Sequence, residues 1–265
     1  MTSLRSGRAK RLAAAVFGVV LATLSSSCAT PASSPSVESG AEDPSKHARE
    51  TAHPEWLSGC RESVESLKSS GKISSAEVVP CERLVDALAT FRVVELDREG
   101  QNDRIEAMRP ELPREVSAFT MNQDESVVAA ISDNLLRNFV EPRAGRDREW
   151  VFQFIDAGQG DKGKSPLQAW VAFLAHDTAV VDESHIADIR VERDVSRDAL
   201  FVTLRLDDFG KRRFHRATLE RMGTRVAYCL GDRVAAAPEV QQPMPGGWIY
   251  VRLDDIKELL GREDL

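Results

Sequence analysis

Hydrophobic and polar residues alternate over residues 199–206, where leucine or valine occupies every second position. This period of two is typical of a strand with one face in a core. Either Asp207 or Asp208 can then cap a helix, which we expect to run to Met222 and to end at Gly223 in a left-handed C-terminal cap. Residues at helical spacing share one apolar face of that helix: Phe214, Ala217, Thr218 and Met222.

After this helix, the pattern predicts a hairpin and a closing strand. Residues 225–230 and 233–237 form two short strands joined by Gly231-Asp232, a pair suited to a two-residue type II′ turn. Proline and glycine interrupt the next stretch, and residues 248–251 predict the last strand. Asp254 is expected to cap a final helix over 255–260, closed by Gly261.

The first half of the chain has a mostly helical pattern. Residues 56–67 and 81–91 are expected to be helices, as are residues 126–139, with Glu125 at the positive end of the helix dipole. The charged stretch 97–115, which two prolines interrupt, predicts a loop or a short helix.

Alternation returns in residues 150–155 and 169–175, which predict strands. We therefore expect an α+β fold, an antiparallel sheet with a packed helix, over residues 146–265. A smaller, mainly helical region over residues 54–145 is expected to precede it.

The N-terminus has the pattern of an export signal. A basic segment and a short apolar run occupy residues 1–27 and predict a signal peptide. The sequence LSSSC around Cys28 resembles a lipoprotein signal, although Ser25 stands where leucine is usual. We expect Cys28 to be acylated, with ordinary cleavage and secretion as the alternative; Ala29 after it favours the outer membrane. Residues 28–53, with almost nothing to bury, predict a disordered tether.

The net charge argues against one class of partner, and the cysteines predict one crosslink. The formal net charge is -7, and removing the signal deletes four basic residues and no acid, which gives -7 minus 4, or -11. Such an acidic chain repels phosphate backbones, which argues against nucleic-acid binding. In an oxidising compartment, Cys60 and Cys81 are expected to form a disulfide that adds about 3 kcal/mol, with two reduced core thiols as the alternative. Cys229 is expected to be a buried free thiol.

Residues 158–165, GQGDKGKS, fit the phosphate-loop pattern, in which Lys164 would hold phosphates and Ser165 would bind magnesium. Pro166 disfavours helical geometry at Ser165, and the following chain is barely long enough for a crossover helix. An exported protein also meets no ATP. We therefore expect a hairpin tip here, and neither a nucleotide nor another cofactor.

Several polar clusters have plain structural explanations. The stretch with His176, Asp177, Asp182, Glu183 and His185 lacks regular metal-ligand spacing, so we expect loop residues and no metal. His215 is expected to be structural or solvated. The basic run 212–216 is expected to be a solvated helix face, with a surface for an acidic partner as the alternative. No nucleophile motif or paired acid indicates catalysis, so no catalytic residue is assigned.

One spacing carries a family resemblance. Glycine, phenylalanine and threonine at four-residue steps precede an apolar strand, an Ala-Pro pair and a Gly-Gly pair: Gly210, Phe214, Thr218, Gly223, the run VAYCL, Ala237, Pro238, Gly246 and Gly247. This order resembles the head of the large periplasmic domain of SecD and SecDF, membrane subunits of the protein-export machinery. It covers roughly residues 185–260, under a third of the chain. Gly231-Asp232 inverts the family's turn, and Cys229 replaces an aliphatic residue.

The resemblance implies a role in export that involves contact with polypeptide. In the family, movement of the head is coupled to proton flow through membrane helices, and this sequence has no such helices. We therefore expect a non-enzymatic periplasmic lipoprotein that binds polypeptide or a membrane complex, held to the membrane through its lipid alone. A scaffold with one fixed protein partner is the alternative, and an unrecognised hydrolase a weaker one. The expected surface is the loop 238–247 with its flanking strands.

Overall fold

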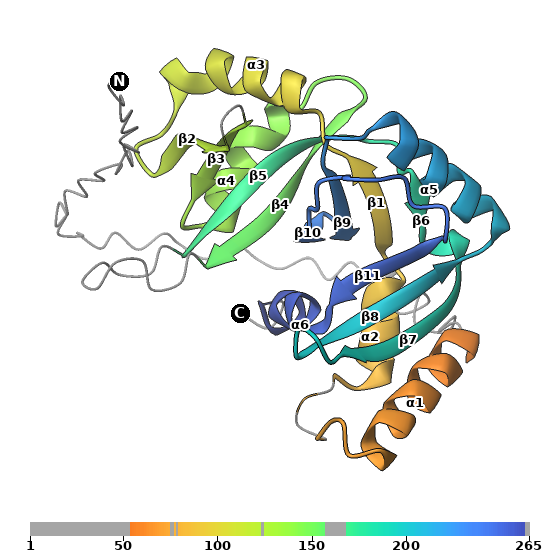
Figure 1. Ribbon diagram of the computed structural model, residues 1–265. Helices are drawn as coiled ribbons and strands as arrows, with labels where there is room; N and C mark the ends of the chain where they lie inside the picture. Colours follow the sequence, from red (N-terminus) through yellow and green to blue (C-terminus); the bar gives the residue numbers. More distant parts are fainter. Residues whose placement is uncertain (1–53, 75–76, 78, 123–124, 157–167, 263–265) are drawn as a thin grey trace, which may run out of the picture. The chain divides into compact units, whose positions relative to one another are not determined.

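The computed structural model describes residues 54–262 except 75–76, 78, 123–124 and 157–167 (Figure 1). The signal peptide, Cys28, the tether and the GQGDKGKS segment lie outside the described residues. Among the helices that the structure describes, none has both the length and the apolar character needed to span a bilayer.

The larger sheet has eight strands in the order β2-β3-β5-β4-β10-β9-β1-β6. Their bounds are β1 Phe91–Glu95, β2 Val116–Asn122, β3 Glu125–Ala130, β4 Arg148–Asp156, β5 Gln168–His176, β6 Val181–Asp182, β9 Val226–Leu230 and β10 Arg233–Ala236. Neighbours pair antiparallel except β4 and β10, which are parallel, so the sheet is mixed.

The smaller sheet is antiparallel and has the order β11-β8-β7. It consists of β7 Ile186–Asp194, β8 Ala199–Leu206 and β11 Trp248–Arg252. The helices are α1 Pro54–Ser69, α2 Cys81–Leu88, α3 Arg98–Met108, α4 Asp133–Val140, α5 Asp208–Glu220 and α6 Leu253–Arg262. Short 3-10 turns, η3 Arg109–Glu111, η4 Glu141–Arg143 and η5 Glu183–His185, complete the described elements.

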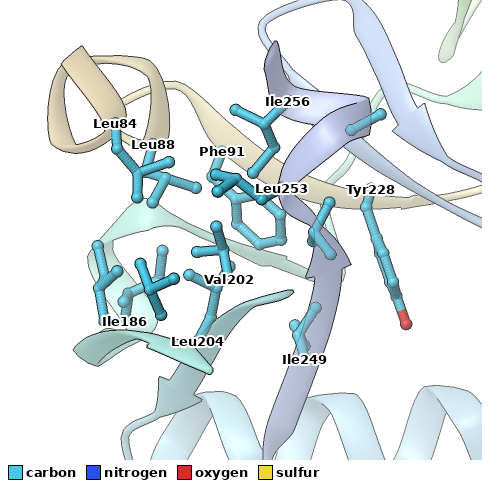
Figure 2. Packing of buried hydrophobic residues seen from close by; sticks show 14 of the residues in the cluster. Leu84, Leu88, Phe91, Ile186, Val202, Leu204, Tyr228, Ile249, Leu253 and Ile256 are labelled. Carbon is cyan, nitrogen blue, oxygen red and sulfur yellow. The ribbon is translucent and has the colours of Figure 1, made fainter. Parts of the chain in front are cut away.

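One hydrophobic core joins the smaller sheet to the end of the larger one. Leu204 and Ile249 of the small sheet share this core with Phe91 of β1 and Leu84 of α2, and Leu253 closes it from α6 (Figure 2). Two further clusters lie on the large sheet, one under α3 and α4 and one that extends across β1, β3, β4, β5, β9 and β10. The small sheet is therefore packed against the rest of the molecule through its inner face.

The predicted α+β class is confirmed, and so is the order of elements after residue 198. The Gly231-Asp232 turn joins β9 to β10, and Gly231 has a φ of 61°. Asp207 caps α5, because its Oδ1 accepts a hydrogen bond from the Gly210 N–H at 2.6 Å. The predicted Cys60–Cys81 disulfide is present, with 5.9 Å between the two Cα atoms.

The predicted helix over residues 126–139 is wrong. Strand β3 takes up its first part and only α4 is helical, while Glu125 begins the strand and caps no helix. Residues 127–130 form a continuous apolar run buried on both faces, and periodicity alone cannot distinguish such a strand from a buried helix. The first half of the chain thus contributes three strands to the large sheet beside the helices α1 to α4.

Smaller differences concern helix ends. The predicted helix over 81–91 stops at Leu88, because Phe91 already belongs to β1. Met222 lies beyond the end of α5 and is 56% exposed, so it is not part of the buried face. Helix α6 begins at Leu253, which places Asp254 in its first turn and not at its cap.

Candidate functional site

The family-motif residues of α5 hold the helix in place. Phe214 is fully buried, and a methyl group at Gly210 would lie 2.7 Å from the Cβ of His185. The Thr218 hydroxyl lies 2.9 Å from the Phe214 carbonyl oxygen, to which it donates, and accepts a hydrogen bond from the Met244 N–H at 3.0 Å. Thr218 therefore ties the loop 238–247 to the helix.

The remaining motif residues fix that loop against the strands. The Gly223 N–H, at a φ of 79°, donates to the Val240 carbonyl at 2.8 Å. The Pro238 carbonyl accepts from Val226, and the Ala237 carbonyl accepts from the Arg225 side chain. Gly247, at a φ of 67°, lies close to the Lys211 side chain, and Gly246 lies against Trp248. The motif residues, predicted as a structural or binding surface, thus have structural roles, and backbone hydrogen bonds hold the loop at Pro238, Val240, Met244 and Gly247.

Strand β11, which follows the loop, has one edge without a partner strand. The Leu206 N–H donates to the Gly247 carbonyl at 2.8 Å, so the opposed pair Gly247 and Leu206 is a hydrogen-bonded one. Such pairs alternate along antiparallel strands. The backbone N–H and C=O of Ile249 therefore point toward β8, whereas those of Trp248 and Tyr250 point away from it. Among the described residues, none makes a hydrogen bond to those outward N–H and C=O groups.

The opposite edge of the same sheet, on β7, is covered by α1. The Val191 N–H donates to Ser63 Oγ at 2.9 Å, and the Trp56 indole N–H donates to the Ile186 carbonyl at 3.1 Å. A methyl group at Gly59 would lie 2.8 Å from the Ile189 carbonyl oxygen, so glycine is needed for this close approach. Helix α1 therefore occupies the position of a fourth strand.

The edge strands of the large sheet are less suited to pairing with an added strand. Strand β6 has only two residues, and β2 has a register shift between Thr120 and Asn122. A short strand and an irregular one are both features that discourage edge-to-edge pairing. Of the described strand edges, that of β11 is thus the regular one that no other element covers.

Residues 160–254 match the family model described as SecDF, P1 head subdomain. These residues resemble the SecDF P1 head subdomain. The match confirms the resemblance predicted from the motif, starts earlier in the chain than expected, and contains β7, β8, α5 and β11.

Solved SecDF structures are also similar to the chain. One, titled as a membrane component SecDF that enhances protein export, is 16% identical over 62% of this chain and 86% of that chain, with a TM-score of 0.28. SecDF in a super-membrane-facing form is 16% identical (61% of this chain, 26% of that chain, TM-score 0.28). SecDF from Thermus thermophilus is 17% identical (61% and 26%, TM-score 0.24), so the chain spans about a quarter of these two proteins. No curated protein matches the chain.

A polar cleft of about 890 Å³ lies beside the head-like region, where β1 ends and α3 begins. Four of its charged residues form two ion pairs: Arg225 with Glu125 at 2.9 Å and Arg221 with Glu95 at 3.1 Å. Asp97 pairs with Arg148, and although burial alone would raise the pKa of Asp97, this pair and the Gly100 N–H lower it. A network of internal ion pairs therefore forms part of the cleft wall.

Sequence reasoning missed this network because its members are far apart in the chain. Glu125 is only 4% exposed, and its partner Arg225 follows it by 100 residues. No local spacing connects the two. The only available signal is a charged residue directly before an apolar strand, a feature that many solvent-exposed residues share.

The predicted polar cluster does not come together as a site. His185 lies 2.8 Å from Asp182 through its Nδ1 and forms part of the cap of η5, whereas His176 lines the cleft at the end of β5. His215 is partly buried, and its Nδ1 has no hydrogen-bond partner among the described residues. Within the described part of the chain, no three His, Cys, Asp or Glu side chains are placed to hold a metal ion.

Cys229 is a buried free thiol, as predicted. Burial raises its pKa to about 12, and burial also raises the pKa of the neighbouring Tyr228 to about 12. A thiol with this pKa is protonated at neutral pH and is therefore a poor nucleophile. Cys229 thus has a packing role in the third core cluster.

Proposed function

We propose that this chain is a non-enzymatic component of the bacterial cell envelope that binds extended polypeptide as part of protein export. The observation that supports it most directly is the unpaired edge of β11, at Trp248 and Tyr250, within the segment that resembles the SecDF P1 head. We further propose that acylated Cys28 anchors the chain to the outer membrane and that residues 29–53 tether it.

An added strand is the binding mode that this edge favours. The outward N–H and C=O groups of Trp248 and Tyr250 would pair with the backbone of the polypeptide, which gives affinity with little dependence on its sequence. Tyr250 is 54% exposed, and Phe201 lies diagonally across from it on β8, opposite Arg252, so side chains of the added strand would meet aromatic surface. Low sequence preference is what a protein contacting many export substrates requires.

A proline at position 250 tests this binding mode. The Tyr250 N–H points away from β8, so Tyr250→Pro removes no hydrogen bond of the sheet but does remove a donor needed for an added strand. Tyr250→Val is the matched control, because it also deletes the aromatic ring but keeps the N–H and favours a strand. We expect Tyr250→Pro to lose at least tenfold in affinity for a fluorescein-labelled, reduced and alkylated unfolded protein, measured by anisotropy.

The valine variant is expected to lose severalfold at most, and both variants should unfold within a few degrees of the native chain. Equal affinity of the proline variant and the native chain would refute strand addition at β11. Photo-crosslinking from position 250 in cells then separates the two functions: many envelope polypeptides indicate export, whereas one abundant product indicates a scaffold with a fixed partner.

A further inference from the structure

Helix α5 exposes an unusual combination of side chains. Of the described residues, six large hydrophobic ones are notably exposed, and three of them belong to α5 or directly follow it: Phe209 at 53%, Leu219 at 52% and Met222 at 56%. Such side chains are normally scattered singly over a protein surface, and their concentration on one element indicates a contact surface.

Cations alternate with these apolar residues along one line of the helix. Phe209, Arg212, Arg216 and Leu219 follow one another at steps of three, four and three residues, which places them on one face about 15 Å long. The opposite face carries Phe214, Ala217 and Thr218, which are buried. The stripe thus points away from the core.

The two arginines of the stripe are not committed elsewhere. Arg212 has no ion pair or hydrogen bond among the described residues, and Arg216 approaches only Glu220, at 3.9 Å, with both side chains largely exposed. By contrast, the neighbouring Arg213 donates to the Ala179 carbonyl and lies over the Phe209 ring. Arg212 and Arg216 are therefore free to meet an external anion.

Helix α5 is positively charged, whereas the rest of the chain is negatively charged. Residues 208–221 contain five basic and two acidic residues, a net charge of +3 in a chain whose total is -7. The rest of the chain therefore carries -10. An anionic surface would repel most of the molecule and attract this helix, which would orient the molecule as it approaches.

We propose that the stripe Phe209–Arg212–Arg216–Leu219 rests on the surface of an anionic phospholipid membrane. Arginines that meet headgroups while Phe and Leu enter the acyl boundary are the arrangement of helices that lie in a membrane interface. An acidic polypeptide would satisfy the arginines alone and would leave the apolar ends of the stripe exposed. This contact adds to the proposed lipid anchor and does not depend on strand addition at β11.

Vesicle binding tests the proposal without the anchor. The chain from residue 45 contains the whole described unit, with its three cores and its disulfide, and lacks the apolar signal and Cys28. We expect it to co-sediment with vesicles of 70% phosphatidylcholine and 30% phosphatidylglycerol, and not with phosphatidylcholine alone. Each arginine near such a surface contributes about fivefold, so Arg212→Gln with Arg216→Gln should weaken binding on the order of 30-fold.

The matched control removes the same charge elsewhere. Arg114 and Arg146 are exposed and lie outside α5, and Arg114→Gln with Arg146→Gln is expected to bind as the native chain does. Leu219→Ser should weaken binding severalfold at unchanged charge. Equal losses in the two double variants, or no preference for anionic vesicles, would overturn the proposal. Binding to polyglutamate with no binding to vesicles would do so as well and would indicate an acidic polypeptide as the partner.

Discussion

The two edges of the small sheet differ in what covers them. On β7 the outward N–H of Val191 is bonded to Ser63 of α1, whereas on β11 the equivalent groups of Trp248 and Tyr250 have no partner among the described residues. An uncovered regular edge invites pairing with other chains, and proteins ordinarily block it. Helix α1 thus blocks one edge, and the other is the edge at which we propose that polypeptide binds.

The covering element comes from outside the head-like segment. Helix α1 ends at Ser69, far before the family match begins at residue 160. It is fixed in two ways: through Trp56, Gly59 and Ser63 against β7, and through the Cys60–Cys81 disulfide to α2. A part of the chain outside the matched segment thus covers one edge of a sheet that the matched segment supplies.

The largest expected effect comes from Trp56→Ala. Trp56 is 1% exposed and bonded to the Ile186 carbonyl, so its removal should lower the free energy of unfolding by about 3–5 kcal/mol, measured by urea denaturation. The matched control is Trp248→Ala at the other edge. Trp248 is only partly buried, so its removal should lower the free energy of unfolding by under about 2 kcal/mol. If both variants lowered the free energy of unfolding equally, the contact of α1 with β7 would not stabilise the protein more than the uncovered edge does.

The next effect concerns the disulfide. Replacing both Cys60 and Cys81 by alanine opens a crosslink between residues 21 apart and should lower the free energy of unfolding by about 3 kcal/mol. Because α1 would then be held by non-covalent contacts alone, binding of unfolded polypeptide should rise as the second edge opens more often. Cys229→Ala is the control, since this buried thiol lies in another core cluster. A double variant as stable as the native chain would contradict a fixing role for the crosslink.

The elements after residue 198 could be predicted from the sequence because the patterns that specify them are local. The alternation over β8, the Asp207 cap and the Gly231-Asp232 turn each lie within a few residues of the structure that they specify. Strand β3 in the first half could not be predicted in this way, because it is buried on both faces and so lacks a period of two.

The candidate site was predictable only in part. The motif pointed to the loop 238–247 and its flanking strands, and the unpaired edge does lie on a flanking strand, β11. The loop itself is hydrogen-bonded to α5 through Thr218 and to β9 through Val226. Which edge is covered depends on α1, whose contact with β7 joins residues 128 positions apart, and no sequence pattern reports such a contact.

The smallest expected effect tests the comparison most directly. Ser63→Ala removes the acceptor for the Val191 N–H and should lower the free energy of unfolding by only about 1 kcal/mol. Hydrogen exchange should nevertheless change sharply at one amide. Val191, protected in the native chain, should exchange nearly as fast as Tyr250, whose N–H has no partner within the described part of the chain. Ser66→Ala, an exposed position on the same helix, should leave both amides unchanged. If Val191 stayed protected in Ser63→Ala, another part of the molecule would be covering the β7 edge, and α1 would be only its neighbour.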